Sequence, residues 1–332
     1  MQHDISLLPY NTFGIDVKAK FFTSVEKTDD LIQLFKNSPE EPLLILGGGS
    51  NILLTRDFEG TVIKNEIKGI EKVYENEKEV HYRVGGGEDW HNFVTFSVAH
   101  GLGGIENLAL IPGNVGASPM QNIGAYGVEI KDVFVSLEAF NLKTHKIEVF
   151  DKEQCQFGYR SSVFKHERKG QYLIAHVTYA LQKQPILDVS YGALKDQLTT
   201  KENYTLRNVF DAVIKIRESK LPNPHQVGSA GSFFKNPYVR NPVYDELKAK
   251  FPEIPAFRID DDYMKIPAGW LIEQCGYKGL RRGAIGVYPK QALVLVNYGG
   301  GEGNEIFSLA MEIKKSVKEK FGIALEPEVN II

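Results

Sequence analysis

The stretch Glu106–Glu129, ENLALIPGNVGASPMQNIGAYGVE, concentrates glycines, small residues and side-chain amides between two hydrophobic segments. Its glycines permit positive φ angles and close approach of the backbone to a ligand; they are Gly113, Gly116, Gly124 and Gly127. Neutral hydrogen-bonding groups come from Ser118, Gln121 and Asn122. Because the interior carries no strong acid or base, the stretch favours a cradle for a large, flat, phosphorylated ligand. A tight connection that needs glycines only for its turns is the alternative.

Composition places the chain among ordinary globular proteins. With 332 residues, 42% hydrophobic and 24% charged, it predicts two or three domains with sizeable cores. The formal net charge of -3 and the lack of a basic run disfavour nucleic-acid binding. Cys155 and Cys275 are too few for a disulfide framework and are predicted to be thiols in or near the core. No secretory signal or membrane-length apolar run occurs, so the sequence predicts a cytoplasmic protein without membrane association.

A second glycine cluster lies upstream of the cradle. LLIL at 43–46 predicts a strand, GGGSN follows at 47–51, and ILLT at 52–55 resumes an extended pattern. A dinucleotide fingerprint needs its glycines to open a helix, whereas here the chain returns to a strand. The cluster therefore predicts either a nest of backbone N–H groups for an anion or a plain hairpin turn.

The rest of the N-terminal part alternates helices and strands. We expect helices at 28–35 and 90–98, the first capped by Thr28, and strands at about 60–65 and 80–84. The segments 133–142, 146–150 and 172–181 alternate as in an antiparallel sheet. An amphipathic helix then carries Leu206, Val209, Phe210, Val213 and Ile214. These patterns predict an α+β class, with a domain boundary in the proline-flanked segment SKLPNPHQVG at 219–228.

The C-terminal part begins with GSAGSFFKNP at 228–237. Asn241 is expected to cap a helix that has Pro242 at its first position and buries Val243, Leu247 and Phe251. A further helix at 267–275, a strand at 292–297 and a long helix containing Ile306, Leu309, Ile313 and Val317 follow. Gly322 is expected to stop that helix, and 325–332 reads as a closing strand.

Several common catalytic machineries are excluded by spacing. The sequence has no phosphate-binding Gly-Lys loop and no G-x-S-x-G elbow, and its eight histidines show no metal-ligand spacing. No metal site is therefore expected, and His91, His100 and His176 are predicted to be packing histidines. A chain rich in backbone cradles and poor in reactive groups indicates a bound organic cofactor.

An ordered set of nine motifs then carries a family resemblance. They are NTFGID, LILGGGSN, NLALIPGNVGASPMQNIGAYGVE, FGYRSSVFK, SKLPNP, GSAGSFFKNP, AGWLIEQCG, KQALVLVN and LEPEV. In this order the set resembles the UDP-N-acetylenolpyruvoylglucosamine reductase (MurB) family and covers the chain from about Asn11 to Val329. Tyr191, in VSYGAL, resembles the loop of the type I subgroup.

The resemblance implies an α+β, FAD-binding fold of the vanillyl-alcohol-oxidase type in two subdomains, with a smaller α+β substrate-binding domain. The expected boundaries are 1–70, with 325–332 joining it, then 71–221 and 222–324. It also implies a cytoplasmic step of peptidoglycan synthesis. NADPH reduces the flavin and leaves, and UDP-N-acetylglucosamine-enolpyruvate then takes a hydride from flavin N5 to give UDP-N-acetylmuramate. A monomer is expected.

Site residues carry over where this sequence matches the motifs. The catalytic positions are Arg160, Ser232 and Glu328. The substrate contacts are Tyr191, Arg217, Lys220, Asn236 and Gln291. The expected FAD contacts are Gly47, Gly48, Gly49, Ser50, Asn51, Ile111, Pro112, Gly113, Gly116, Ala117, Ser118, Gln121, Asn122, Gly124 and Tyr126. Asn330 departs from members that carry arginine there, so a cationic contribution to that side of the pocket is expected to be missing or supplied from elsewhere.

Reduction of an enolpyruvyl group explains why these residue types would be needed at the catalytic positions. Hydride addition to the enolpyruvyl group places negative charge on the α-carbon and its carboxylate. Arg160 is suited to bind this carboxylate, because its guanidinium is permanently charged and can donate two parallel hydrogen bonds. Ser232 has a hydroxyl proton to deliver from a glycine-rich turn, and Glu328 orients the intermediate or relays that proton. Taken singly, each residue is more typical of a surface ion pair, a loop cap or a solvated strand position.

Two other classes of protein stay open at this point. One is a flavoprotein oxidase or dehydrogenase of the same cofactor fold that acts on an unrelated alcohol. The other is a catalytically inactive sugar-nucleotide binder. A visible spectrum separates them, because flavin bands bleached by NADPH belong only to the enzymes.

Overall fold

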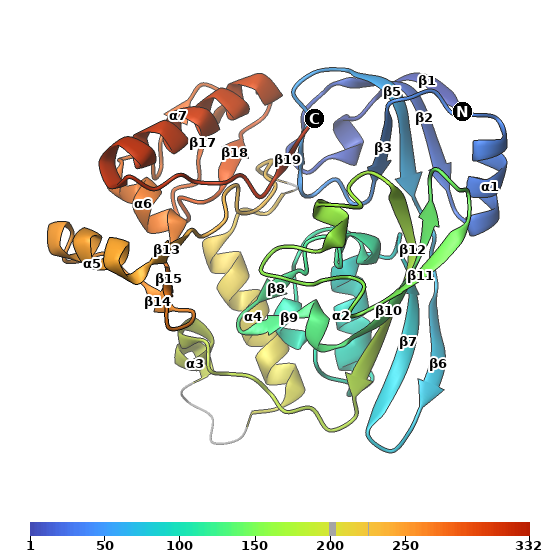
Figure 1. The fold of residues 1–332 in the computed structure, drawn as a ribbon, viewed down its shortest axis with the longest axis horizontal. Helices are drawn as coiled ribbons and strands as arrows, with labels where there is room; N and C mark the ends of the chain where they lie inside the picture. The colour runs from blue at the N-terminus through green and yellow to red at the C-terminus, as the bar shows by residue number, and fades with distance from the viewer. Residues whose placement is uncertain (199–203, 225) are drawn as a thin grey trace. The chain divides into compact units, whose positions relative to one another are not determined.

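The computed structural model describes residues 1–198, 204–224 and 226–332 (Figure 1). The chain forms two compact units. The first comprises Met1–Ile5, Ala19–Gly49 and Phe58–Ser219, and the second comprises Ser6–Lys18, Ser50–Asp57 and Lys220–Ile332. Helices and sheets occur in both units, which confirms the predicted α+β class.

A four-stranded sheet forms one part of the first unit. Its order is β1 (Gln2–Ser6), β2 (Lys18–Val25), β5 (Phe58–Asn65) and β3 (Leu43–Leu46). The β5 strand pairs in parallel with both β2 and β3. Because parallel strands are buried on both faces, β5 consists of consecutive buried residues from Gly60 onward. Helix α1 (Thr28–Lys36) packs Leu31 and Phe35 into the same apolar cluster as Ile63.

A five-stranded antiparallel sheet forms the other part of the first unit. Its order is β11 (Ile147–Asp151), β10 (Phe134–Asn141), β12 (Tyr172–Gln182), β7 (Glu79–Gly85) and β6 (Ile70–Glu75). Helices α2 (Trp90–Ala99) and α4 (Leu206–Lys220) lie beside this sheet (Figure 1) and contribute Trp90, Phe93, Val209 and Val213 to the core that they share with it. Helix α3 (Gly192–Leu198) is a short addition to that core.

The cradle stretch itself consists of short turns and bridges, as expected where glycines interrupt regular pairing. Its elements are η2 (Glu106–Leu108), η3 (Val115–Ala117), β8 (Gly124–Ala125), β9 (Val128–Glu129) and η4 (Ile130–Asp132). A last turn, η5 (Val163–Lys165), follows the segment that carries Arg160.

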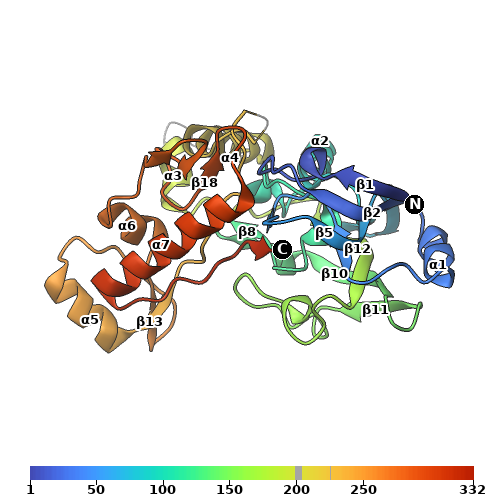
Figure 2. The same cartoon turned by 90° about the horizontal axis from the view of Figure 1, so that it is seen from above.

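The second unit is built from small sheets and three helices. Helix α7 (Gly303–Phe321) packs on β17 (Ile285–Val287), β18 (Leu295–Asn297) and α6 (Ala268–Gln274) (Figure 2). The remaining elements are η1 (Leu8–Tyr10), β4 (Ile52–Leu53), β13 (Tyr238–Arg240), α5 (Asn241–Lys250), β14 (Phe257–Arg258), β15 (Tyr263–Lys265), β16 (Arg281–Arg282) and β19 (Asn330–Ile331). The four expected stripe residues of α7 are buried, and Gly322 ends the helix with φ of 71°.

Some predictions of helix caps and of buried helix residues were wrong. Asn241 is the first residue of α5 and not its cap, because its side chain donates to the Asp261 carbonyl oxygen at 2.6 Å. Val243 is 45% exposed, so α5 buries a narrower stripe than expected. Thr28 is likewise inside α1, and Asp30 accepts the N–H groups of Glu26 and Lys27 in its place.

Candidate active site

Two glycine loops of the first unit touch each other. A Cβ atom at Gly48 would lie 2.7 Å from Asn114 Oδ1 and 2.8 Å from Gly113 Cα. Gly49 and Gly113 have φ angles of 61° and 117°, which other residues rarely adopt. The strands β3 and β4 on either side of the first loop belong to different sheets, so this loop is not a hairpin turn. Only glycine fits this approach, and the two loops together form an open backbone cradle.

The second loop is tied to the chain that leads into α2. The Trp90 N–H donates to the Gly113 carbonyl oxygen at 2.9 Å, and Asn114 Nδ2 donates to the Gly87 carbonyl oxygen at 2.6 Å. A Cβ atom at Gly116 would lie 3.0 Å from the Gly86 carbonyl oxygen, so this contact also requires glycine. The cradle is therefore held in place by the residues at the N-terminal end of α2.

The side chains predicted to contact the cofactor divide into buried and accessible ones. Ser118 Oγ bonds Tyr179 Oη at 2.6 Å, and Asn122 Nδ2 donates to Glu129 Oε2 at 2.9 Å, so both shape the cradle from inside. The accessible positions are Gly47, Gly48, Ser50, Asn51, Ile111, Pro112, Gly113, Ala117, Gln121 and Tyr126. Gly116 and Gly124 are buried and act through their lack of a side chain.

Two arginines and a tyrosine meet beside Gly124 within the first unit. Arg160 has φ of 51°, and a Cβ atom at Gly124 would lie 3.3 Å from its Nη1. Arg217 on α4 bonds the Tyr126 hydroxyl and is close enough to Arg160 for their charges to interact. Burial lowers the pKa of Arg217 and raises the pKa of Tyr126. In the part of the chain that the structure describes, buried Arg217 Nε has no hydrogen-bond partner. Such a cluster suits an anionic ligand.

Tyr191 lies next to this cluster, and sequence reasoning missed the residue that holds it there. Its ring packs edge-on against Tyr126, with 5.3 Å between ring centroids, and it is 49% exposed. Asn107 Nδ2 donates to the carbonyl oxygens of Tyr126 and Asp188 at 2.8 and 2.9 Å. Asn107 therefore joins the two segments that carry the tyrosines. An asparagine in the segment ENL gives no signal of this role.

Within the second unit, Ser232 and Glu328 lie on neighbouring segments. The Glu328 N–H donates to the Phe233 carbonyl oxygen at 2.8 Å, and the Phe233 N–H donates to the Leu293 carbonyl oxygen at 2.8 Å. Ser232 is exposed and Glu328 is half-buried. Gly231, with φ of 70°, turns the chain immediately before Ser232. The backbone thus presents a hydroxyl and a carboxyl group from two paired segments.

The other predicted residues of the second unit gather at the start of α6 or lie apart from it. Asn236 Oδ1 accepts the Ala268 N–H at 2.9 Å, and a Cβ atom at Gly269 would lie 2.9 Å from Gln291 Oε1. Both amides therefore lie at the first turn of that helix. Lys220 is an exposed residue at the end of α4.

Asn330 holds the loop that contains Ser50 and Asn51. The Asn330 N–H and Nδ2 both donate to the Asn51 carbonyl oxygen, at 3.1 and 3.0 Å. Asn51 Nδ2 in turn donates to the Glu328 carbonyl oxygen at 3.4 Å. Asn330, at the position where some members of the family that the sequence resembles carry arginine, thus makes a neutral contact to the predicted FAD loop.

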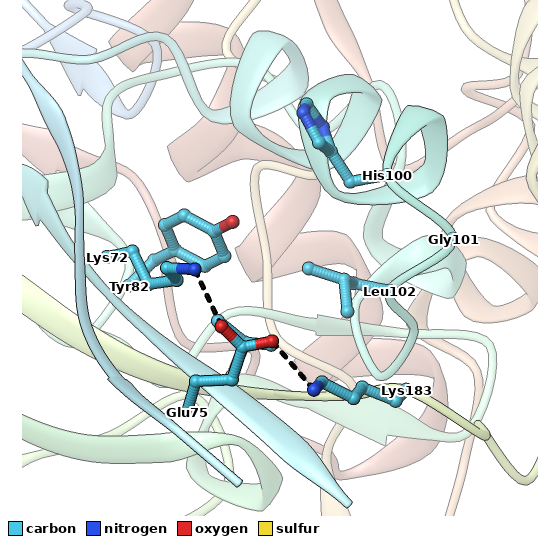
Figure 3. A pocket seen from close by; sticks show the side chains of 8 residues that line it. Lys72, Glu75, Tyr82, His100, Gly101, Leu102 and Lys183 are labelled. Carbon is cyan, nitrogen blue, oxygen red and sulfur yellow. Dashed lines mark hydrogen bonds and ion pairs between the residues drawn. The ribbon is translucent and has the colours of Figure 1, made fainter. Parts of the chain in front are cut away.

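A separate surface pocket of the first unit has a volume of about 290 Å³ and involves none of the predicted residues (Figure 3). Glu75 bonds Lys72 at 2.6 Å and Lys183 at 2.7 Å across it. Hydrogen bonds from Lys183 and Lys72 lower the pKa of Glu75 to about 2. One carboxylate therefore already occupies both cations of this pocket.

Neither a metal-ligand cluster nor a membrane-spanning helix occurs in the described ranges. Across 1–198, 204–224 and 226–332, no group of three or more His, Cys, Asp or Glu side chains is placed to hold a metal ion. Over the same ranges, none of the helices has the length and apolar character needed to cross a bilayer. Cys155 is buried, Cys275 is half-buried, and both are free thiols, as predicted.

Comparison with known proteins supports the interpretation of the cradle as a cofactor site. Residues 19–148 match a family model described as an FAD binding domain. A solvent-stable cholesterol oxidase superposes with a TM-score of 0.51 at 11% identity, covering 97% of this chain and 86% of that chain. Fold and cradle together define an FAD-binding flavoprotein of the vanillyl-alcohol-oxidase type.

Longer matches define the family. Residues 223–332 match the C-terminal domain of UDP-N-acetylenolpyruvoylglucosamine reductase. Reductases of that name from Amoebophilus asiaticus and Flavobacterium johnsoniae are 49% and 47% identical, covering 100% of this chain and 99% of each relative. The crystal structure of the enzyme (MurB) from Thermus caldophilus superposes with a TM-score of 0.68 at 23% identity, covering 98% of this chain and 97% of that chain. The chain therefore belongs to the UDP-N-acetylenolpyruvoylglucosamine reductase family.

Proposed function

We propose that this chain is an NADPH-dependent flavoenzyme of peptidoglycan synthesis that reduces UDP-N-acetylglucosamine-enolpyruvate to UDP-N-acetylmuramate. The full-length relatives support the reaction. The observation that carries the proposal is the cation at the cradle, where Arg160 lies against Gly124 in a left-handed backbone conformation. An enolpyruvyl carboxylate needs such a cation beside the group that supplies the hydride.

The residues present fit FAD. At Gly48, which is half-buried, an added Cβ atom would collide with Asn114 and Gly113 of the segment 111–126. Such backbone allows close approach of a flat ring and a diphosphate. FAD, when bound, supplies a flavin N5 that accepts a hydride from NADPH and passes it on. The chain supplies binding, orientation and charge.

Arg160 is proposed to grip the substrate carboxylate. Negative charge grows on the α-carbon and carboxylate as the β-carbon gains its hydride, and a fixed guanidinium stabilises that charge more than it stabilises the substrate. Its φ of 51° indicates a conformation that the surrounding structure enforces. A preorganised cation costs no rearrangement when the charge appears.

Ser232 is proposed to donate the proton to the α-carbon. Its exposed position after Gly231 supports close approach of the hydroxyl to a ligand. Because a serine hydroxyl is a weak acid, the strongly basic enolate drives the transfer. Glu328 is proposed to orient the intermediate or to relay the proton, which fits its place on the segment paired with Phe233.

The remaining contacts belong to the sugar nucleotide. We propose that Arg217 and Lys220 bind its diphosphate, and that Tyr191, Asn236 and Gln291 contact the rest of the molecule. The buried, unsatisfied Nε of Arg217 among the described residues supports an anionic partner. Tyr191, half exposed beside Tyr126, offers an aromatic face.

The finer organisation of the protein is part of the same proposal. We propose FAD-binding subdomains at 1–70, joined by 325–332, and at 71–221, with substrate binding at 222–324. Parallel pairing of β19 with β4 supports the association of 325–332 with the loop that contains Asn51. NADPH as the reductant, a cytoplasmic location and a monomeric state complete the proposal.

The test is product analysis. The purified protein should carry a flavin spectrum that NADPH bleaches, and incubation with NADPH and UDP-N-acetylglucosamine-enolpyruvate should give UDP-N-acetylmuramate by mass spectrometry. A flavin spectrum with oxidation of an unrelated alcohol would favour an oxidase. A protein without flavin that binds the sugar nucleotide would be a binding protein only.

A further inference from the structure

One titratable side chain holds the cofactor cradle. We call residues 108–116 the strap, because they are bonded along their length to residues 86–91. The donors and acceptors are mostly backbone, amide and indole groups, which do not titrate near neutral pH. They are Gly116 N to Gly86 O, Val115 N to Glu88 O, Trp90 N to Gly113 O, Asn114 Nδ2 to Gly87 O and Trp90 Nε1 to Leu108 O. The exception is the imidazole of His91.

His91 binds the strap at a residue whose backbone conformation is strained. The Leu110 N–H donates to His91 Nδ1 at 3.1 Å. Leu110 has φ of 56°, a conformation that is unfavourable for a residue with a Cβ atom. The next residues, Ile111, Pro112 and Gly113, begin the predicted FAD contacts. The bond to His91 therefore holds a strained residue that sets the path of the cradle.

The imidazole must be neutral to make this bond. A backbone N–H can only donate, so Nδ1 must keep its lone pair and the ring carries its proton on Nε2. Burial lowers the pKa of His91; Asp89 at the start of α2 opposes this shift, and the charge of Arg217 on α4 adds less to it than Asp89 takes away. The ring also stacks on Phe210 of α4, with 5.8 Å between centroids and an angle of 8°. These contacts favour the neutral form.

We infer that neutral His91 is a positioning residue for the cofactor, and that its protonation releases Leu110 and weakens FAD binding. The inference rests on the FAD site proposed above. A protonated ring would point an N–H at the Leu110 N–H, so the bond would become a repulsion. The strap would then lose its bond to His91 at Leu110, the residue that precedes the predicted FAD contacts.

The test measures FAD release from the holoprotein by the fluorescence of free FAD after dilution, between pH 8 and pH 5. Wild-type protein should bind FAD about ten-fold more weakly at the acidic end, the change expected for one hydrogen bond. His91→Ala should be about ten-fold weaker at pH 8, with little further loss on acidification. His91→Asn, whose Oδ1 replaces Nδ1 as acceptor without titrating, should bind like wild type at pH 8 and stay constant.

His100→Asn is the matched control, because His100 caps the C-terminal end of the same helix and its Nδ1 bonds the Phe96 carbonyl oxygen. It should keep the wild-type pH dependence. The inference is overturned if His91→Asn keeps that dependence, if His91→Ala binds FAD like wild type at pH 8, or if the wild-type affinity does not change with pH. Wild-type protein that binds no FAD at any pH would overturn the proposed function as well.

Discussion

Four residues of the site have left-handed backbones although none of them is glycine. They are Leu110, Asn122, Tyr126 and Arg160, with φ angles of 56°, 45°, 50° and 51°. Each such conformation costs about 1–3 kcal/mol and persists only where surrounding contacts enforce it. Asn107 bonds the Tyr126 carbonyl oxygen and His91 bonds the Leu110 N–H, so the enforcing contacts are identifiable. The strain lies at the residues that shape the site.

Sequence reasoning reached only part of this arrangement. The glycines of the cradle were predictable, because glycine is the residue that a left-handed or crowded backbone position requires. Leucine and tyrosine in the same conformation give no such signal. Asn107 and His91 were also missed as holding residues, since a single amide or imidazole has the same appearance in a surface turn.

Ser232→Ala separates the two half-reactions. Flavin reduction by NADPH delivers no proton to a carbon atom, so we expect it to stay within a few-fold of wild type. Reoxidation by the enolpyruvyl sugar nucleotide should slow by about 10² to 10⁴, the range of general-acid contributions. Stopped-flow absorbance measures each rate. Reoxidation near the wild-type rate would assign the proton to Glu328 or to water, and equal loss of both rates would indicate a structural role.

Lys220→Ala should weaken binding of the sugar nucleotide. Loss of one charged hydrogen bond to the diphosphate predicts about 1.5–3 kcal/mol, measured as a dissociation constant by calorimetry. Lys215→Ala is the control, because Lys215 is another exposed lysine of α4 that the motifs do not assign to the substrate. Equal effects of the two substitutions would mean that only the general charge of the helix matters.

Helices and strands were predicted correctly where the sequence has one clear hydrophobic period. The buried stripe of α7 and the antiparallel strands β10, β11 and β12 were predicted correctly, because a clear period sets which face is buried. The strands β1, β2 and β6 and helix α3 were not predicted. The strand β6 is exposed except at Ile70, which is half-buried, so its alternation is weak. The strand expected at 292–297 is regular only at Leu295–Asn297, where it pairs with β17.

Gly322→Ala tests the end of α7. Gly322 has φ of 71° and no atom within 4 Å of an added Cβ, so the cost comes from the backbone alone. We expect a loss of about 1 kcal/mol in the free energy of unfolding, measured with chemical denaturant. Gly192→Ala is the control, because that glycine has no positive φ and equal space. Equal stability of Gly322→Ala and wild type would contradict the proposed helix stop.

Glu138→Gln tests the outer face of the five-stranded sheet. Glu138 accepts from Arg83 Nε at 2.5 Å and Nη2 at 2.7 Å, and this hydrogen bonding lowers its pKa. A lowered pKa contributes stability that is present above the unfolded value of about 4.3 and is lost as pH falls through the folded value. Partial exposure limits the loss in Glu138→Gln to about 1 kcal/mol at pH 7.

The same experiment predicts how this loss depends on pH. Denaturant unfolding should show the difference between wild type and Glu138→Gln shrinking as the pH falls below about 4. Glu71→Gln is the control, since Glu71 is more exposed and lies 3.6 Å from Arg83; it should change stability by less than about 0.5 kcal/mol. A Glu138→Gln difference that is constant with pH would contradict the assignment of the shift to this pair.

At the scale of the molecule, the second unit draws residues from three parts of the chain. Residues 6–18 and 50–57 belong with the C-terminal part. The pairing of β4 with β19 and the bond from Thr55 Oγ1 to the Ile332 carbonyl oxygen join them to it. Local periodicity does not reveal such pairing, because the partners are about 280 residues apart in sequence. The family resemblance was the source of the expectation that 325–332 joins residues 1–70.

The proposal to test at this scale is that NADPH reduces the flavin and leaves before the sugar nucleotide takes the hydride. The protein should be reduced by one equivalent of NADPH without oxygen, freed of nicotinamide nucleotide, and mixed with UDP-N-acetylglucosamine-enolpyruvate in a stopped-flow instrument. We expect the flavin spectrum of the oxidised protein to return as one equivalent of UDP-N-acetylmuramate forms. A flavin that stays reduced until oxygen is admitted, or that reoxidises only while NADPH is bound, would contradict it.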